Sequence, residues 1–527
     1  MSEIKYKKKG VMDALTIVRE VISVLTNQEK ATAKTYLVSF VEKGKEASSR
    51  SVKLFEILLS LKGKDISSEL IARMVLGKVN RNSFNHLTAR LLSKVFEALS
   101  IDVNIEREGA YPETTKTNIA IRKNITHAQI LQKRGLLDVA AFLFEKIIKK
   151  GIAYEFYEEV LIAIRGLLRI RVMTEGEKSI KYLLKKYEKY DSFKNAVLHA
   201  EVNYGKVISQ TEFHSHNIIK ADWLRQILDD MSEDFKKTRS IQIGYYYYYI
   251  ETCFNQIQRN FSAARRSLLS LQRLLESGPA MNVAEMKGGV LVNLGENDLF
   301  LCEFDRGYDH LEKAAVFLKS DIFNYEQCRE SMFYAKFYEG EYKIAANVIF
   351  ELQPDTLSQD NFRKGKRGFL LASTYFMLGD FPTTLRHINL INPIKADKEG
   401  WNLGIKTLHI MTLIELKDFD QATAKIDSLR KDFENGKQND RAKMICSIFH
   451  SLCYNGYNFK TTYQSEKGAI EMLESNAGAL AWQIKSSEMI LFHQWIFAKA
   501  FRQEFVQKIP SFQISIPKEN SKKQVPG

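Results

Sequence analysis

YAKFYEGEYKIAANVIFELQP, which spans Tyr334–Pro354, has a pattern that returns in LASTYFMLGDFPTTLRHINLINP, which spans Leu371–Pro393. In each stretch a turn glycine, Gly340 or Gly379, separates two segments rich in apolar residues. An aromatic residue follows the glycine by two positions, a small or short residue lies three positions later, and an aliphatic residue lies four positions after that. A proline, which breaks a helix interior, ends each stretch. This pattern predicts a hairpin of two helices.

The same hairpin recurs along the second half of the chain. Its aromatic positions lie 38, 39 and 38 residues apart. The aromatic, small and aliphatic residues of the four copies are Phe304, Gly307 and Leu311; Tyr342, Ala345 and Ile349; Phe381, Thr384 and Ile388; and Phe419, Ala422 and Ile426. Because one helical hairpin cannot bury its own apolar face, stacked copies must share a core. The repeat therefore predicts an α-solenoid, in which the small residue lets two helices approach closely.

These units resemble tetratricopeptide repeats. The resemblance rests on the turn glycine, the aromatic, the small residue, the aliphatic residue and the closing proline of the two quoted stretches. A third stretch, Ile410–Leu429, keeps the aromatic and the alanine but has Lys417 in place of the turn glycine. The resemblance is good over Leu299–Leu429 and extends from about Asn118 to Gln483. The interval is longer than the family's 34 residues, so the repeats are divergent.

The resemblance implies an all-α fold built as a right-handed solenoid, and a non-catalytic role as a scaffold or adaptor. In this family the first helices of successive hairpins line a concave surface that binds a segment of a protein or a peptide. The lysines and asparagines of the family's carboxylate clamp are not found at matching offsets in this chain. We therefore expect a protein or peptide partner without assigning binding residues from the family.

Four regions are predicted along the chain. Residues 1–103 form a basic helical block, and residues 118–483 form the tetratricopeptide-like solenoid. A terminal helix follows at 484–506, and residues 507–527 form a flexible tail. The tail alternates apolar and polar residues at Phe512, Ile514 and Ile516, so it is either a frayed end or a short docking peptide.

The positive charge is concentrated near the start of the chain. The formal net charge is +14, and the first 150 residues hold 27 Lys and Arg against 16 Asp and Glu. Within Asp65–Phe96, two helices are expected on either side of Gly77, and Arg81, Arg90 and Lys94 lie on or before the second. This arrangement fits either a nucleic-acid-binding helix-turn-helix or another helical hairpin with a solvated basic face. Nucleic acid is therefore the alternative partner.

Two further groups are candidate partner-binding residues. Within the run of five tyrosines at Tyr245–Tyr249, either Tyr245, Tyr248 and Tyr249 contact a partner or they pack in the solenoid core. A basic run begins the first helix of a repeat and contains Arg363, Lys364, Lys366 and Arg367. It either receives an acidic segment of a partner or is a solvated charged face.

The sequence lacks the residues that several classes of function require. His214 and His216 are two apart, but no further ligand lies close enough in sequence to suggest a metal site. The chain has no phosphate-binding loop and no nucleophile motif, so we expect neither an enzyme nor a cofactor. Five scattered cysteines without a C-x-x-C pair favour a reducing cytoplasm. Neither a secretory signal nor an apolar run long enough to span a bilayer is expected.

Overall fold

The computed structural model describes residues 14–41, 49–61, 66–101, 111–175, 177–213, 221–319, 321–352, 361–395, 397, 400–434, 440–476 and 480–510. Within these residues the chain is helical nearly throughout and contains no β-strand. By internal contacts it divides into two compact units, Met1–Lys116 and Thr117–Gly527. None of the described helices is both long and apolar enough to cross a membrane.

The first unit is a small helical bundle built around its longest helix. Its helices are α1 (Ala14–Val24), α2 (Asn27–Val38), α3 (Arg50–Leu61), α4 (Ser68–Leu76) and α5 (Arg81–Ile101). Helix α5 packs against each of the other four. The core is apolar, and Val18, Phe55, Ile71 and Leu91 are fully buried within it.

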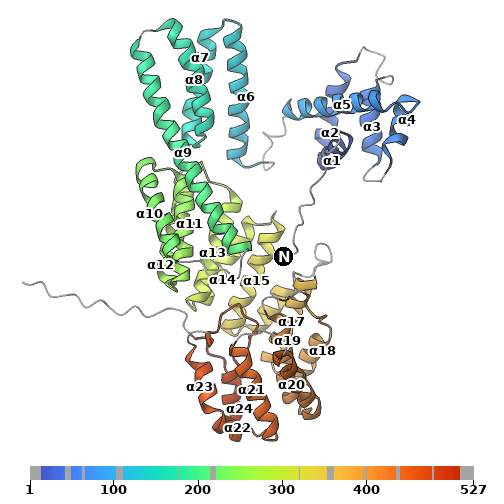
Figure 1. Cartoon of the computed structure of the whole chain (residues 1–527), viewed down its shortest axis with the longest axis vertical. Helices are drawn as coiled ribbons and strands as arrows, with labels where there is room; N and C mark the ends of the chain where they lie inside the picture. The colour runs from blue at the N-terminus through green and yellow to red at the C-terminus, as the bar shows by residue number, and fades with distance from the viewer. Residues whose placement is uncertain are drawn as a thin grey trace, which may run out of the picture. The chain divides into compact units, whose positions relative to one another are not determined.

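The second unit is a succession of helices in which each packs against the next along most of the chain (Figure 1). Its first helices are α6 (Glu113–Lys133), α7 (Leu137–Ala153), α8 (Tyr157–Thr174), α9 (Glu177–Phe213), α10 (Ala221–Thr238), α11 (Ile241–Ile257), α12 (Phe261–Glu276) and α13 (Ala284–Phe300). Next come α14 (Phe304–Phe317), α15 (Ile322–Glu339), α16 (Tyr342–Phe350), α17 (Asn361–Met377), α18 (Phe381–Asn389), α19 (Trp401–Glu415) and α20 (Phe419–Glu434). The last are α21 (Asp440–Tyr454), α22 (Phe459–Ser465), α23 (Lys467–Ser475) and α24 (Phe492–Phe501).

One turn geometry joins many neighbouring helices. In each case a residue with positive φ lies between the two helices, and the next N–H donates to the carbonyl five residues back, which is the Schellman arrangement. The residues with positive φ are Gly135, Glu155, Arg259, Cys302, Gly340, Gly379, Lys417 and Gly456. The matching hydrogen bonds each join a backbone N–H to a backbone carbonyl oxygen. Donor and acceptor residues are Leu136 and Leu131, Phe156 and Gly151, Asn260 and Asn255, Glu303 and Asp298, Glu341 and Lys336, Asp380 and Tyr375, Asp418 and Leu413, and Tyr457 and Leu452.

Polar caps start several of the second helices at the residue after the turn. The side chains of Asn260, Asp380, Asp418 and Asn458 each accept a hydrogen bond from the N–H three residues later, at 3.1–3.2 Å. These caps satisfy backbone donors that the first turn of a helix leaves unpaired. Hydrogen bonds from the side chain and the backbone N–H of Thr383 also lower the pKa of Asp380.

The predicted small positions lie at close helix contacts. Ala345 and Ala422 are fully buried. Gly307 of α14 faces Gly295 of α13, and a Cβ added at Gly307 would lie 3.0 Å from the Gly295 carbonyl oxygen. A larger residue would therefore push the two helices apart. The all-α fold and the solenoid of tetratricopeptide-like hairpins are confirmed by these contacts and by the repeated turn.

The aromatic positions of the repeat contact aromatic rings of the same or the next hairpin. Phe304 lies beside Tyr338 with ring centroids 6.1 Å apart. Tyr342 and Phe381 each meet a ring of the preceding helix at 5.4 and 5.3 Å. Phe419 stacks on Tyr457 of the following hairpin at 4.5 Å but stays exposed. The aromatic position therefore links helices in all four copies, although it is fully covered in none of them.

The end of the solenoid differs from the expected terminal helix at 484–506. Only Phe492–Phe501 is helical, as α24, and residues 480–491 form an irregular segment before it. The apolar residues of this segment are buried against other helices, so they do not form a helical stripe of their own. Of the predicted tail, residues 507–510 are described, while Phe512, Ile514 and Ile516 lie outside the described residues.

Candidate functional site

An irregular stretch of chain lies along the first helices of the C-terminal hairpins. We call Leu480–Leu491 the closing segment. Its side chains and backbone contact α13, α15, α19 and α21, each of which is the first helix of a hairpin. These contacts define the inner face of this part of the solenoid. They show that the inner face accommodates a stretch of irregular chain.

Lys485 of the closing segment contacts the inner face at α13 and α15. Its Nζ forms an ion pair with the Glu296 carboxylate and donates to the Ser331 hydroxyl at 3.0 Å. Ser331 also donates to Glu296 at 2.7 Å. Burial by itself would raise the pKa of Glu296, but Lys485 and Ser331 outweigh it, so the pKa lies below its ordinary value. Glu296 is therefore held as a carboxylate by the residue that binds it.

Glu488 binds the other side of the inner face. Its carboxylate accepts from the Arg441 guanidinium of α21 at 2.5 and 3.2 Å, and Arg441 is buried. Arg441 also donates to the carbonyl oxygens of Leu473 and Leu480, at 2.9 and 2.8 Å. Such a buried bidentate pair fixes both the position and the direction of the segment.

The middle of the closing segment approaches the backbone of α19. A Cβ added at Gly404 would overlap the carbonyl oxygen of Ser487, so only glycine allows this approach. The neighbouring Ser486 hydroxyl is buried without a hydrogen-bond partner among the residues that the structure describes. The segment is therefore closely fitted to the inner face while one of its polar groups stays unsatisfied.

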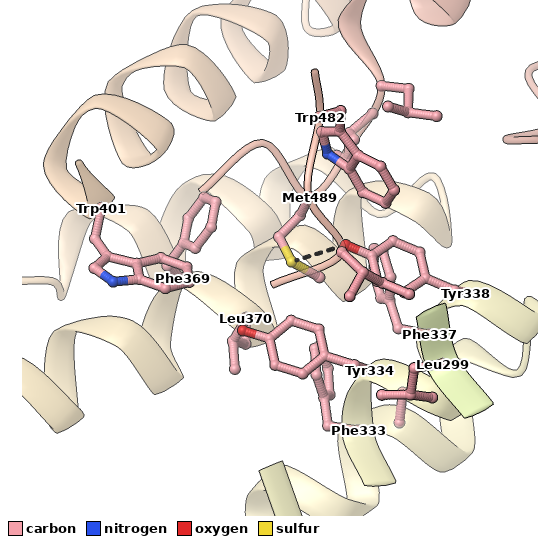
Figure 2. Packing of buried hydrophobic residues seen from close by; sticks show 14 of the residues in the cluster. Leu299, Phe333, Tyr334, Phe337, Tyr338, Phe369, Leu370, Trp401, Trp482 and Met489 are labelled. Carbon is pink, nitrogen blue, oxygen red and sulfur yellow. Dashed lines mark hydrogen bonds between the residues drawn. The ribbon is translucent and has the colours of Figure 1, made fainter. Parts of the chain in front are cut away.

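Apolar contacts add to the two charged anchors, and Figure 2 shows several of them. Trp482 meets Tyr338 of α15 edge to face, with ring centroids 5.5 Å apart. The Tyr338 hydroxyl points at the sulfur of Met489, 3.5 Å away, as the dashed line in Figure 2 shows. Trp482, Ile484 and Met489 are buried. Burial raises the pKa of Tyr338 well above its ordinary value, so the hydroxyl stays protonated.

His493 extends this cluster into α24. It is buried, and its Nδ1 lies 3.5 Å from the Arg441 guanidinium. Burial, aided by the positive charge of Arg441, lowers the pKa of His493 to about 4. The imidazole is therefore neutral near neutral pH and would gain a proton only in acid.

The basic run predicted to receive a partner lies on α17, and most of it is paired within the chain. Arg363 and Arg367 both donate to the Glu326 carboxylate of α15, at 2.6 and 2.9 Å. Arg367 also donates to the Leu352 carbonyl oxygen at 2.8 Å. Lys364 is exposed.

Lys366 of the same run is engaged as well. It forms an ion pair with Glu330, and its Nζ lies 4.7 Å from the centre of the Trp401 ring. Together with the two arginines it links α17 to α15 and α19. The structure thus gives this run a role in stacking hairpins, and its role toward a partner stays a prediction.

The five tyrosines lie on α11 and are all half-buried. Tyr245 and Tyr249 approach Tyr204 of α9, with ring centroids 6.2 and 5.1 Å away. Tyr248 meets Phe235 of α10 edge to face at 5.9 Å. The run therefore packs α11 between α9 and α10, and each tyrosine keeps part of its surface open. Whether that surface contacts a partner stays a prediction.

Within the described chain the possible metal ligands are dispersed, and the cysteines are half-buried or buried. No cluster of His, Cys, Asp and Glu there could hold a metal ion. His214 and His216 lie outside the described residues. All five cysteines are free, and burial raises the pKa of Cys253 and Cys446 to about 11. These two thiols are therefore poor nucleophiles near neutral pH.

The helix pair predicted in the basic block is present in the first unit. Helix α4 ends at Gly77, which has a φ of 74°, and α5 begins four residues later at Arg81. Arg81 and Arg90 are exposed, whereas the Lys94 Nζ lies 3.5 Å from the centre of the Phe40 ring. The helices are therefore as expected, and the two exposed arginines are available to a partner.

The inner-face residues were not foreseen from the sequence. Glu296, Arg441 and Lys485 are single charges in otherwise ordinary helical or loop sequence, and none belongs to the repeat pattern. Gly404 is the one member that carries a local signal, because a glycine within an apolar helical stretch often marks a close approach.

Comparison with known proteins gives structural likeness only. No family model matches the chain, and no curated protein matches it by sequence. Among solved structures it is similar to the apo form of RapI, with 12% identity and a TM-score of 0.43 over 68% of this chain and 87% of that one. It is also similar to a STAND protein with a tetratricopeptide repeat sensor from Pyrococcus horikoshii. That match has 12% identity and a TM-score of 0.29 over 89% of this chain and 66% of the other.

Proposed function

We propose that this protein is a non-catalytic scaffold or adaptor that binds an extended segment of a protein or peptide on the concave surface of its solenoid. One observation carries the proposal. The inner face of the C-terminal hairpins already holds an irregular stretch of the chain through two charged anchors and a set of apolar contacts. A surface that binds one segment in this way has the chemistry to recognise another.

The chemistry of the described residues supports a binding role over catalysis. The ionisable groups of the inner face are paired with each other, as Glu296 is with Lys485 and Glu488 with Arg441. Paired groups of this kind position a segment, whereas general acid–base catalysis needs a group free to exchange a proton with a substrate. The free cysteines support a reducing compartment such as the cytoplasm.

Hydrogen–deuterium exchange with an identified partner tests the binding surface. The partner is captured on the full chain, identified, purified and added back to the purified protein. We expect slower exchange on first helices such as α13, α15 and α19, and unchanged exchange on second helices such as α14 and α16. Protection confined to the second helices or to the first unit would contradict the proposal.

One observation favours a second function, nucleic-acid binding by the first unit. The exposed surface of α5 includes Arg81, Asn85, His86 and Arg90, and no acidic residue occurs from Arg81 to Phe96. Arginine and asparagine are the side chains that most often contact base edges and phosphates. The exposed surface of this helix is therefore basic, and Arg81 and Arg90, nine residues apart, lie on opposite sides of it.

Anisotropy with labelled duplex DNA and RNA at several salt concentrations tests the second function. If it is right, binding by the full chain weakens steeply with salt, and Arg81→Ala with Arg90→Ala lowers the salt slope by about one per lost phosphate contact. Lys53→Ala, which removes an exposed lysine of α3, is the matched control. Equal binding by the three proteins would rule out α5 as the binding surface.

A further inference from the structure

The C-terminal inner face is already occupied in the free chain. The closing segment contacts four first helices, so a partner cannot lie on the same residues while the segment is in place. The contacts are specific to this stretch of chain, because Gly404 leaves room only for a backbone and each charged anchor meets a single opposite charge. The closing segment therefore has the properties of a ligand held by its own protein.

We propose that the closing segment is an intramolecular ligand that blocks the C-terminal inner face, and that a partner segment of like chemistry binds there by displacing it. The proposal rests on the proposed function, since it names how the same concave surface is regulated. The partner it fits is an extended peptide with an aromatic residue, then a basic residue, then an acidic residue. In this chain those positions are Trp482, Lys485 and Glu488.

The bonding of the segment favours displacement over permanent burial. Its two strongest anchors are ion pairs, and a competing segment can replace an ion pair without loss when it brings the same charge. The Ser486 hydroxyl, buried without a partner among the described residues, makes the closed state less favourable than a fully satisfied one. The Tyr338 hydroxyl bonds only a thioether in the segment, and sulfur is a weak acceptor.

The segment also differs in backbone structure from the helices it covers. Residues 480–491 contain one short turn and otherwise no regular structure, whereas α13, α15, α19 and α21 are continuous helices. The N–H groups of Leu491 and Phe492 donate to the side chains of Gln507 and Glu488, at 2.8 and 3.1 Å. The segment can therefore open without breaking the backbone hydrogen bonds of the hairpins.

A synthetic peptide supplied in trans tests the proposal. The probe is LAWQIKSSEMIL, the sequence of residues 480–491, with both ends blocked and a fluorescent label. The receptor is the full chain with Trp482→Ala and Lys485→Ala, which weakens the internal segment and leaves every receptor residue intact. We expect this variant to bind the probe at least about tenfold more tightly than the wild-type chain does.

Matched controls locate the binding. A probe that carries the same two alanines should not bind. Gly404→Ala added to the variant chain should abolish binding, because the new methyl group overlaps the Ser487 carbonyl, whereas Gly289→Ala should leave it unchanged. Gly289 lies in α13 and a Cβ there meets nothing within 4 Å. A folded variant that does not bind the probe overturns the proposal.

Hydrogen exchange of the wild-type chain decides the question if the double variant does not fold. A displaceable segment exchanges the amides of 480–491 faster than those of α13 and α15. Exchange of all these amides at one common rate would make the segment an inseparable part of the core and would overturn the proposal. Both measurements use only the purified chain and a synthetic peptide. If both measurements contradict the blocking role of the closing segment, the proposed binding of a partner is still tested separately, by the hydrogen–deuterium exchange experiment with that partner.

Discussion

Helices α8 and α15 occupy similar places but differ in what covers them. Each packs between its two neighbours in the chain, α7 and α9 or α14 and α16. Helix α8 keeps an exposed stripe that contains Glu158, Ile162, Arg165 and Arg169. In α15 every side chain from Ser331 to Ala335 is buried, and Lys485 of the closing segment contacts Ser331.

The difference teaches that stacking hairpins does not by itself bury the inner face. Neighbouring hairpins cover two sides of each helix, and a third side stays exposed unless another element covers it. In α15 a further side is covered where the closing segment contacts Ser331 and Tyr338. In α8 it remains a mixed stripe of charged and apolar residues. The two regions thus share their hairpin contacts and differ in their inner faces.

Substitution of the small residue should have the largest effect, and it should be equal in both regions. Ala140 of α7 and Ala345 of α16 are both fully buried. Ala140→Glu and Ala345→Glu each place a charge in a tight helix contact, so we expect a loss of about 4 kcal/mol or more in unfolding free energy. Urea unfolding measures both. Ile344→Glu, at the exposed neighbour of Ala345, should cost no more than about 0.5 kcal/mol.

Replacement of an arginine by alanine should lower stability much more in one region than in the other. Arg441→Ala leaves Glu488 buried without its partner, so we expect a loss of about 3–5 kcal/mol. Arg165→Ala removes an exposed arginine from the stripe of α8 and should change stability by about 0.5 kcal/mol at most. Thermal unfolding of the two variants gives the comparison. Equal losses would mean that the inner face of α8 is covered as well.

The pH dependence of stability should come partly from His493. Its pKa is about 4 in the folded chain against an ordinary value of 6.5, so the unfolded chain binds the proton more readily. Stability should therefore fall as the pH is lowered from about 6.5 to about 4, by roughly 3 kcal/mol from this group. His493→Gln should flatten that part of the curve of melting temperature against pH. An unchanged slope would place the histidine outside the buried cluster.

The smallest effect is expected at the turns. Lys417 has a φ of 62°, which is unfavourable for a residue with a Cβ. Lys417→Gly should therefore raise the unfolding free energy by about 0.5–1 kcal/mol, and Gly379→Ala should lower it by about 1 kcal/mol. Chemical unfolding of both variants measures the difference. A loss of stability in Lys417→Gly would show that the lysine side chain contributes more than its backbone strain costs.

The hairpins could be predicted from the sequence because their signals are local. Gly340 and Gly379, with the aromatic and small residues after them, mark turns within a few positions. The turns at Cys302 and Lys417 have the same geometry without a glycine. In the sequence they are therefore indicated only by the aromatic residue that follows. The aromatic spacing is periodic, and a period is readable without any knowledge of long-range contacts.

The inner face could not be predicted because its contacts have no period. Lys485 meets Glu296 across 189 residues, and Met489 meets Tyr338 across 151. A single lysine and a single glutamate carry no sign of pairing in one sequence. Residues 484–491 are rich in apolar side chains, which favoured a helix there, but these side chains pack on other helices instead.

The separation between Lys485 and Glu296 also sets an order of events during synthesis. The two residues lie 189 positions apart, and chains grow at about 5–20 residues per second, so roughly 10–40 s pass between their additions. During that interval α13 and α15 are made while the closing segment does not yet exist. Helix α21, the last of the four receptor helices, ends at Tyr454, so the complete receptor precedes the closing segment by only 26 residues, or about 1–5 s. A partner that binds α13 and α15 alone would meet no competing segment during the longer interval. A partner that needs all four helices would have to compete with the closing segment almost from the start.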